Sequence, residues 1–430
     1  MGVREVPASI GQRLLWFLEH YRPDSASLNC PVVCRLHGPL DVGELQIALD
    51  RLAARHEALR TTLVRQGRNL VQHVHDPAPV RVRHVDLPDP DEETLGGAVA
   101  AEVRDNVDVS EWPVRVTLWR LGPDEHVLSV NMHHLVSDAW SCGIIVQDLI
   151  RLLEAGPDGE PDLTPIGWQY PEFAQWQHEL MTRGELKPHQ DYWTGQLTGL
   201  TLPDVPMREL DPQAPRRSYL EAETIDRETF NRLRLLARTE RTTLFTVMLS
   251  LYYLILQRET GSTDLAVASL FANRSRREVQ STVGFFANML MLRTRIPLGA
   301  SFREVVQATR RTVVDAFLHE GIPYQMLPVR FQTNGRRADD VVFQMLLTPP
   351  PGTKVTARGV DFDLYVPEAL RSRFGLELGL IPQPGGDCRA LLFYDDQFDP
   401  EWARAFLTDY VALAVRAAGA PDRRPQPDPV

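Results

Sequence analysis

The chain has 430 residues, of which 43% are hydrophobic and 24% are charged, an ordinary composition for a globular protein. Its length predicts two domains of about 200 residues each. The formal net charge of −11 argues against a general nucleic-acid binder, which needs a basic surface. The longest apolar runs are far shorter than the roughly 20 residues that span a bilayer, and no apolar signal segment follows Met1. We therefore expect a cytoplasmic protein.

Hydrophobic periodicity in the first half predicts a mixture of helices and strands. The spacing predicts helices over residues 10–18 and 42–56, and strands over residues 32–36, 114–121 and 127–132. Ser137 and Asp138 are typical of helix starts, and apolar residues at helical spacing follow them over residues 142–153. A helix is therefore predicted directly after this pair.

The second half repeats the same kinds of elements. The pattern predicts helices over residues 227–239, 244–258 and 302–319, and strands over residues 265–270, 288–296, 341–347 and 390–394. Two halves of similar content indicate the α/β (α+β) class with two related lobes. We place these lobes at residues 1–175 and 216–430, joined by a linker over residues 176–215.

The cysteines, Cys30, Cys34, Cys142 and Cys388, form no CxxC pair and have no zinc-ligand spacing. This usage fits a reducing compartment. We interpret Cys30 and Cys34 as small buried apolar residues rather than as a redox pair.

The most informative stretch is residues 132–141, MHHLVSDAWS. His133 and His134 follow a predicted strand and precede a predicted helix, so they lie on a loop that can hold an imidazole rigidly and still expose it. A histidine titrates near neutral pH and can accept a proton from an amine or a hydroxyl group. From the residues alone a structural role, a catalytic role and a metal site all stay open, and Asp138 is equally a simple helix cap.

The sequence contains no GxSxG nucleophile elbow and no glycine-rich phosphate loop. A covalent enzyme intermediate is therefore not expected. The simplest use of the histidines is direct transfer, in which one imidazole helps an amine or hydroxyl group attack an activated acyl group.

Residues 132–141 resemble the HHxxxDG signature of the condensation domains of nonribosomal peptide synthetases, a signature shared with a wider superfamily of carrier-dependent and CoA-dependent acyltransferases. Other segments resemble further motifs of this family in the family's order. They are residues 9–18 for the first motif, 55–61 for the second, 170–176 for the fourth, 283–293 for the fifth and, more loosely, 319–324 for the sixth, the histidine signature being the third. The resemblance covers essentially residues 8–400. HHxxxD alone is a weak pattern, whereas six segments in order are a strong one.

This resemblance implies two chloramphenicol-acetyltransferase-like lobes that form a V-shaped pseudo-dimer with a tunnel between them. It also implies amide formation by attack of an amine on an acyl or peptidyl thioester. The acyl group would be borne on the 4′-phosphopantetheine of a donor carrier protein, the acceptor being a second carrier or a soluble amine. We expect a monomer with no cofactor and no metal. The alternatives are an ester-forming or acyl-CoA-dependent acyltransferase, a noncatalytic docking domain and, less favoured, an epimerase.

Carried over residue by residue, the resemblance makes His134 the principal catalytic residue, which orients or deprotonates the attacking amine. His133 belongs to the same motif and is expected to be mainly structural. Asp138 would orient the loop through an arginine, for which Arg274 is the candidate because it precedes the fifth motif. The substrate tunnel would be lined by Ala139, Trp140, Ser141 and Asn288.

The chain departs from the family pattern at three places. Ala139 replaces the glycine that usually follows the aspartate, the seventh motif is barely visible over residues 331–347, and Gly375 stands where an aspartate is usual. Docking of an acidic carrier would need local basic patches. Candidates are residues 216–217, 274–277 and 310–311, for which scattered solvated charges are an equal interpretation.

Overall fold

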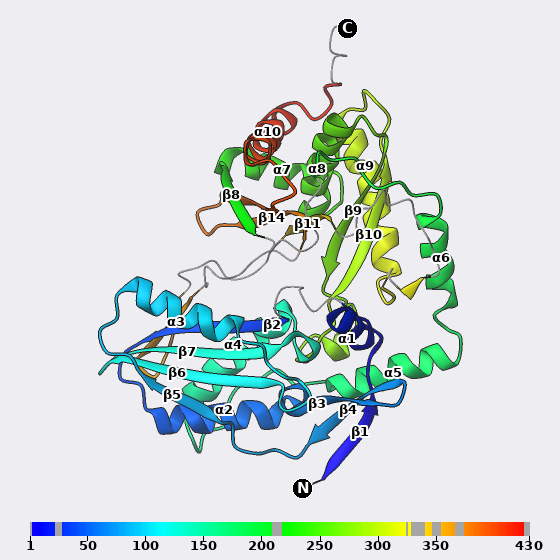
Figure 1. Ribbon diagram of the computed structural model, residues 1–430. Coiled ribbons are helices and arrows are strands. Elements are labelled where there is room, and N and C mark those ends of the chain that lie inside the picture. Colours follow the sequence, from blue (N-terminus) through cyan, green and yellow to red (C-terminus); the bar gives the residue numbers. More distant parts are fainter. Residues whose placement is uncertain are drawn as a thin grey trace. The chain divides into compact units, whose positions relative to one another are not determined.

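The computed structural model describes residues 2–21, 28–208, 217–323, 326–327, 340–345, 354–365 and 374–424 (Figure 1). The chain forms two compact units. Unit 1 comprises Met1–Leu186, Ala272–Ala287 and Pro351–Leu370, and unit 2 comprises Lys187–Phe271, Asn288–Pro350 and Arg371–Val430. Each unit contains a six-stranded sheet with helices packed on it. The mixed α/β fold with two lobes is confirmed.

Unit 1 is built on a sheet with the strand order β12-β13-β2-β7-β6-β5. The bounds of these strands are Lys354–Ala357, Val360–Leu364, Asn29–His37, Glu125–His133, Val114–Gly122 and Val82–Asp86. A separate three-stranded sheet, β1-β4-β3, consists of Val3–Pro7, Asn69–His75 and Thr61–Gln66. The helices of this unit are α1 (Ile10–Tyr21), α2 (Val42–Arg55), α3 (Glu92–Arg104), α4 (Ala139–Ala155) and α5 (Tyr170–Thr182).

The central strands of this sheet are covered on both faces. Val32 and Val130 point into a large core with residues of α2 and α4, whereas Val33 and Val127 pack with Leu95 and other residues of α3. Alternate side chains of a strand point to opposite faces, so both faces of β7 are buried. The strand that leads to the histidines is therefore held rigidly from both sides.

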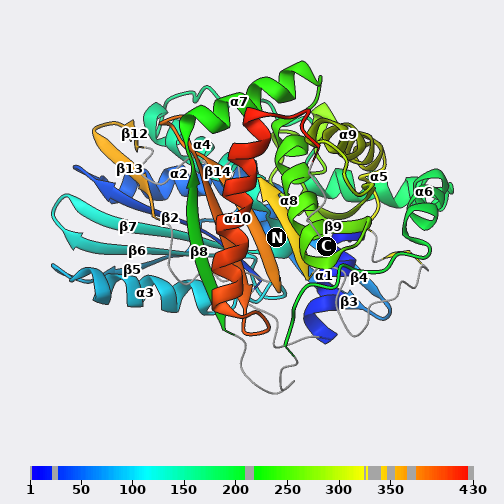
Figure 2. The ribbon, with the colours of Figure 1, turned by 90° about the horizontal axis from the view of Figure 1, so that it is seen from above.

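Unit 2 has the strand order β10-β9-β11-β14-β15-β8. The bounds of these strands are Asn288–Arg295, Asp264–Phe271, Val341–Met345, Leu376–Pro382, Cys388–Asp395 and Ser218–Ile225. Its helices are α6 (Lys187–Leu197), α7 (Arg227–Thr239), α8 (Leu244–Thr260), α9 (Phe302–Leu318) and α10 (Pro400–Gly419). Figure 2 shows α10 crossing over β8, with α7 and α8 beside it. No helix of the described residues is long and apolar enough to cross a membrane.

Two stretches of the C-terminal half return to unit 1. Strand β13 pairs antiparallel with β2, and the segment Ala272–Ala287 hydrogen-bonds to α4 and α5. The predicted division at residues 175 and 215 placed both stretches in the second lobe. Periodicity predicts helices and strands but not which distant segments pack against them. The predicted linker over residues 176–215 contains the end of α5 and the whole of α6.

Candidate functional site

The two histidines lie where β7 ends, on a short loop that enters α4. We call residues 133–138 the histidine loop. Its backbone is anchored at both histidines, because the His133 N–H donates to Pro113 O at 2.9 Å and the His134 N–H donates to Leu28 O at 2.7 Å. Asp138 caps α4 by accepting the Ser141 N–H at 2.8 Å, so the predicted helix start is confirmed.

The ring of His134 is half-buried and has a defined tautomer. Its Nδ1 lies 2.7 Å from the carbonyl oxygen of Ser137. A carbonyl only accepts hydrogen bonds, so Nδ1 carries the proton of the neutral ring and Nε2 carries the lone pair. The edge-on ring of Phe285 packs against the imidazole at a centroid distance of 5.1 Å. This arrangement presents Nε2 as the basic atom.

The ring of His133 is enclosed by the protein, with 3% of the residue exposed. Its Nδ1 accepts the Leu135 N–H at 3.0 Å, and its Nε2 lies 3.3 Å from a carboxylate oxygen of Glu19. Both ring nitrogens thus contact groups of unit 1. The geometry supports a structural role for His133.

The structure brings Asp138 and Arg274 together as a buried ion pair, with 2% of each side chain exposed. Nη2 of Arg274 donates to the two carboxylate oxygens at 3.1 and 3.3 Å. The same carboxylate accepts the backbone N–H groups of Phe286 at 3.0 Å and Ala287 at 3.3 Å. Several donors offset the cost of burying this charge, because a buried ion must be both paired and hydrogen-bonded.

Ser141 is fully buried and joins this network. Its hydroxyl lies 2.7 Å from Asp138 Oδ1 and 2.9 Å from Arg274 Nη2, and it accepts the Gly284 N–H at 3.0 Å. Having no accessible surface, its side chain supports the loop and does not line a substrate passage. We therefore reassign Ser141 from the predicted tunnel to the network below the histidines.

Motif residues far apart in the sequence support the histidine loop. The side-chain amide of Gln12 donates to Leu135 O at 3.0 Å. The Tyr170 hydroxyl donates to Phe285 O at 2.7 Å, and a Cβ atom on Gly284 would lie 2.0 Å from the Tyr170 ring. Sequence reasoning matched the segments that contain these residues to the family but did not assign the contacts.

The second motif holds α4 at its middle. Arg55 Nε and His56 Nε2 lie 2.8 and 3.0 Å from the same carboxylate oxygen of Asp148. Asp148 is three turns further along α4 than the histidine loop. This motif therefore fixes the helix that the loop enters.

The other predicted tunnel residues have different surroundings. Ala139 and Trp140 are both exposed on the first turn of α4, and the Trp140 indole N–H donates to Gln280 O at 3.0 Å. Asn288 belongs to unit 2, where its side-chain amide donates to Glu320 O. The role of these three residues toward a substrate stays a prediction.

Two other interpretations need correction. Arg274 was a candidate for a basic docking patch, but its buried pairing with Asp138 removes it from the surface. Cys34 is buried as expected, whereas Cys30 is only half-buried and lies beside Cys142, with 3.3 Å between the two Sγ atoms. Arg216, and residues 331–339 and 346–347 of the weak seventh motif, lie outside the described residues.

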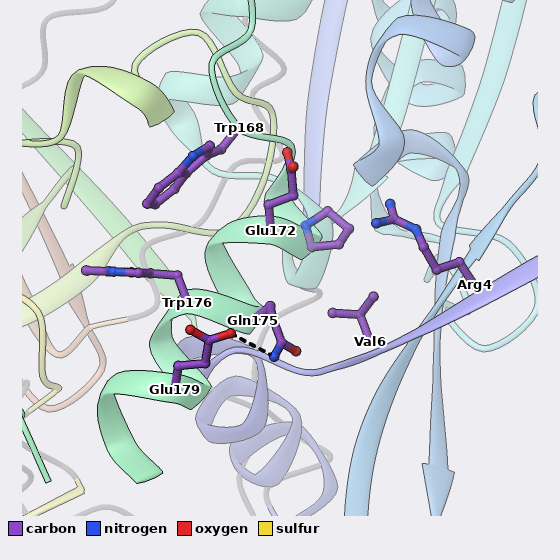
Figure 3. Close-up of a pocket in the computed structure, with 8 residues that line it drawn as sticks. Arg4, Val6, Trp168, Glu172, Gln175, Trp176 and Glu179 are labelled. Carbon is purple, nitrogen blue, oxygen red and sulfur yellow. Dashed lines mark hydrogen bonds between the residues drawn. The ribbon is translucent and has the colours of Figure 1, made fainter. Parts of the chain in front are cut away.

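A pocket of about 280 Å³ lies elsewhere on unit 1. Figure 3 shows Arg4 and Val6 of β1 facing side chains of α5, with the rings of Trp168 and Trp176 nearby. The guanidinium of Arg276 lies over both indoles, 5.1 and 4.5 Å from the two ring centroids. None of the residues that line this pocket belongs to the histidine loop.

A sequence profile of the condensation domain matches residues 3–423. The chain belongs to the condensation domain family. Cyclosporin synthetase simA of Tolypocladium inflatum is 30% identical in an alignment of 431 positions, which covers 97% of this chain and 3% of that protein. The chain thus spans a small part of the curated relatives it matches.

Solved structures share the fold over nearly the whole chain. The X-domain from teicoplanin biosynthesis has a TM-score of 0.84 at 24% identity, covering 99% of this chain and 97% of that one. The SgcC5 protein from Streptomyces globisporus has a TM-score of 0.74 at 26% identity, covering 97% and 100%. These likenesses agree with the two-lobe α/β fold.

Proposed function

We propose that this condensation domain catalyses amide formation between an amine and an acyl or peptidyl group bound as a thioester to a carrier protein. The observation that carries the proposal is the state of His134. Its Nδ1 proton is held by Ser137 O, so its basic Nε2 is oriented by the protein. The buried Asp138–Arg274 pair fixes the loop on which this imidazole stands.

In the proposed reaction, the amine nitrogen attacks the thioester carbonyl carbon and a tetrahedral intermediate forms. Nε2 of His134 accepts a proton from the amine, and the intermediate then expels the phosphopantetheine thiolate. The imidazolium returns its proton to this thiolate, so the products are an amide and a free carrier thiol. A positioned acid–base group of this kind typically contributes about 10²–10⁴-fold to the rate.

The partners in this proposal are a donor carrier protein and an amine acceptor, either soluble or on a second carrier. The 4′-phosphopantetheine arm belongs to the carrier and arrives with the substrate. The proposed steps require no metal and no cofactor bound to this chain, and they involve a single copy of it.

The test compares two histidine variants with a donor carrier loaded with an acyl thioester and with a panel of amines. We expect His134→Ala to keep its fold and to lower product formation at least about 10²-fold, as measured by intact-protein mass spectrometry. The matched control is His189→Ala, which removes a half-buried imidazole in unit 2 and is expected to change turnover less than about twofold. Near wild-type turnover of His134→Ala would overturn the catalytic assignment.

Ester formation is a second candidate, favoured by one comparison. SgcC5 was crystallised with (R)-(-)-1-(2-naphthyl)-1,2-ethanediol, whose nucleophilic groups are hydroxyls. The same His134 Nε2 could accept the proton of an attacking hydroxyl group in place of that of an amine. Matched amine and alcohol acceptors in one assay distinguish the two reactions by the mass of the product.

A noncatalytic docking role is a third candidate, favoured by the likeness to the X-domain, which was solved in complex with OxyB. Ala139 in place of the usual glycine is compatible with such a role. This candidate predicts that the chain binds a partner protein but forms no condensation product. It also predicts that the wild type and His134→Ala bind the partner with the same affinity and that neither forms product.

A further inference from the structure

Two cysteines lie next to the histidine loop, one on β2, the strand paired with β7, and one on α4. Cys30 is on β2, opposite Met132, the residue before His133. Cys142 is in the first turn of α4, where its N–H donates to Asp138 O at 3.0 Å. Their Sγ atoms are 3.3 Å apart although 112 residues separate them in sequence. Both residues are half-buried, whereas Cys34 and Cys388 are buried.

We propose that Cys30 and Cys142 form a reversible disulfide that ties β2 to the start of α4 and thereby controls the histidine loop. The disulfide site stands on the geometry of unit 1 alone. Its effect on turnover rests on the proposed condensation activity.

The oxidant in this proposal is a low-molecular-weight disulfide such as glutathione disulfide. The thiolate of one cysteine attacks a sulfur of the oxidant, forming a mixed disulfide and releasing one thiol. The thiolate of the other cysteine then displaces the second thiol and forms the Cys30–Cys142 bond. The two protein thiol protons end on the two released thiols, so two electrons pass from the protein to the oxidant.

The bond requires a local movement. A disulfide has an S–S length of about 2.05 Å, so the sulfur atoms must approach each other by about 1.3 Å. Rotation of the two side chains, or a shift of β2 or of the first turn of α4, brings the sulfur atoms together, and this first turn carries the Asp138 cap. The bond therefore restrains the helix turn that follows the histidine loop, on which the His134 imidazole stands.

The resting pair is expected to stay reduced without an oxidant. The contact with Cys30, together with burial, raises the pKa of the Cys142 thiol well above its usual range. A thiolate is the attacking species, so exchange at this pair is slow and needs sustained exposure to the oxidant.

The test incubates the whole chain with glutathione disulfide and reads the product by intact mass and by peptide mapping under nonreducing conditions. We expect a loss of two hydrogen masses and one Cys30–Cys142 linked peptide. The control variant Cys34→Ser/Cys388→Ser keeps both buried positions small and should oxidise like the wild type, whereas Cys142→Ser should not form the bond. Absence of the linked peptide from the oxidised wild type would overturn the site, and this readout needs no folded variant.

The same oxidised sample is then assayed for condensation and for hydrogen exchange at the α4 amides. We expect at least about fivefold slower product formation, restored by dithiothreitol, and slower exchange in the first turn of α4. If the protein with the Cys30–Cys142 disulfide formed product at the normal rate, the proposal that the disulfide controls the histidine loop would be wrong. If the reduced protein forms no product, the proposed function fails while the linked peptide still decides the disulfide.

Discussion

Each unit of this chain contains a pair of histidines, and the two pairs differ in what their ring nitrogens contact. In unit 1, His133 and His134 are adjacent in sequence, and Nδ1 of His134 donates to a backbone carbonyl. In unit 2, Nδ1 of His189 on α6 lies 3.0 Å from Nδ1 of His319, which follows α9. One ring of that pair must donate and the other accept, so the basic nitrogen of one imidazole is used by the other.

The comparison teaches that the surroundings of an imidazole, and not its presence, decide which of its ring nitrogens is held in a hydrogen bond and by which group. The pair in unit 2 is packed by aromatic contacts, such as the Tyr192 ring stacked on His319 at 4.1 Å. Burial lowers the pKa of both His189 and His319 from their usual range. The loop of unit 1 instead rests on a buried ion pair with backbone and hydroxyl donors around it. Variants that remove this network should therefore affect the histidine loop of unit 1 and leave the histidine pair of unit 2 unchanged.

The largest expected effect is the loss of the Arg274 charge. Arg274→Ala leaves the Asp138 carboxylate buried without its cation, and removing one partner of a buried pair typically costs about 3–5 kcal/mol. We expect a lower unfolding midpoint in urea and faster hydrogen exchange at Phe286 and in the first turn of α4. The control is Lys187→Ala, which breaks an exposed pair with Asp191 in unit 2 and should cost less than about 1 kcal/mol. Similar losses in the two variants would contradict the role of this network.

Sequence patterns predicted the elements better than their long-range contacts. Helix α7 has the predicted bounds of 227–239, because its apolar residues recur on one face between a capping aspartate and the helix end. The predicted linker over residues 176–215 took in the end of helix α5, because that part of the chain is rich in proline and glycine; Pro171 itself lies in the first turn of the helix, where proline is tolerated. Strands β12 and β13 were not predicted, since such short segments give little periodic signal.

In the candidate site, too, local elements could be predicted from the sequence but contacts between distant residues could not. The histidine loop, its strand and its helix follow from local patterns in residues 126–153. The Asp138–Arg274 pair was anticipated only through the family resemblance, because 136 residues separate the two positions. The Cys30–Cys142 contact gave no signal, since no spacing rule connects a strand residue to a distant helix residue.

The second prediction tests the close approach of the fifth motif to Tyr170. Gly284→Ala places a Cβ atom 2.0 Å from the Tyr170 ring, so the ring or the segment must move. Overpacking of this kind typically costs about 1–3 kcal/mol, and we expect the loss in thermal unfolding together with reduced turnover. The control is Gly195→Ala in α6, where no atom lies within 4 Å of the added carbon and the helix should gain up to about 1 kcal/mol. A Gly284→Ala protein as stable as the wild type would show that the approach is not tight in solution.

The third prediction concerns Ala139, exposed beside the histidine loop on the first turn of α4. If carrier-borne donors pass this residue, its side chain limits their size. A methylene in a fitted site typically changes selectivity by about 1–3 kcal/mol. We expect Ala139→Gly to keep the fold and to shift the ratio of kcat/KM toward bulkier acyl donors, and Ala139→Leu to block carrier-borne donors. A normal rate for Ala139→Leu would show that donors do not pass this position.

The smallest expected effect is the pH dependence of the contact that fixes α4. His56 is 1% exposed, and burial lowers the pKa of its imidazole from the usual 6.5, against the opposing influence of Asp148. Its Nε2–H faces Asp148, and its buried Nδ1 has no hydrogen-bond partner among the described residues, so a proton added there is poorly satisfied. The unfolded chain then binds this proton more readily than the folded chain. The contribution of neutral His56 to the free energy of unfolding is therefore fully present above about pH 6.5, and it is lost as the pH falls below that value.

Each unit by which that pKa is lowered corresponds to about 1.4 kcal/mol lost at a pH below both values. We expect His56→Gln, which keeps an N–H donor for Asp148, to be less stable at pH 7.5 but to lose less stability than the wild type between pH 7.5 and 5. The measurement is the urea midpoint at each pH for the two proteins. His37→Gln serves as the control, since His37 lies at the half-buried end of β2, and it should follow the wild-type profile. Parallel profiles for the wild type and His56→Gln would show that acid weakens the protein at other groups.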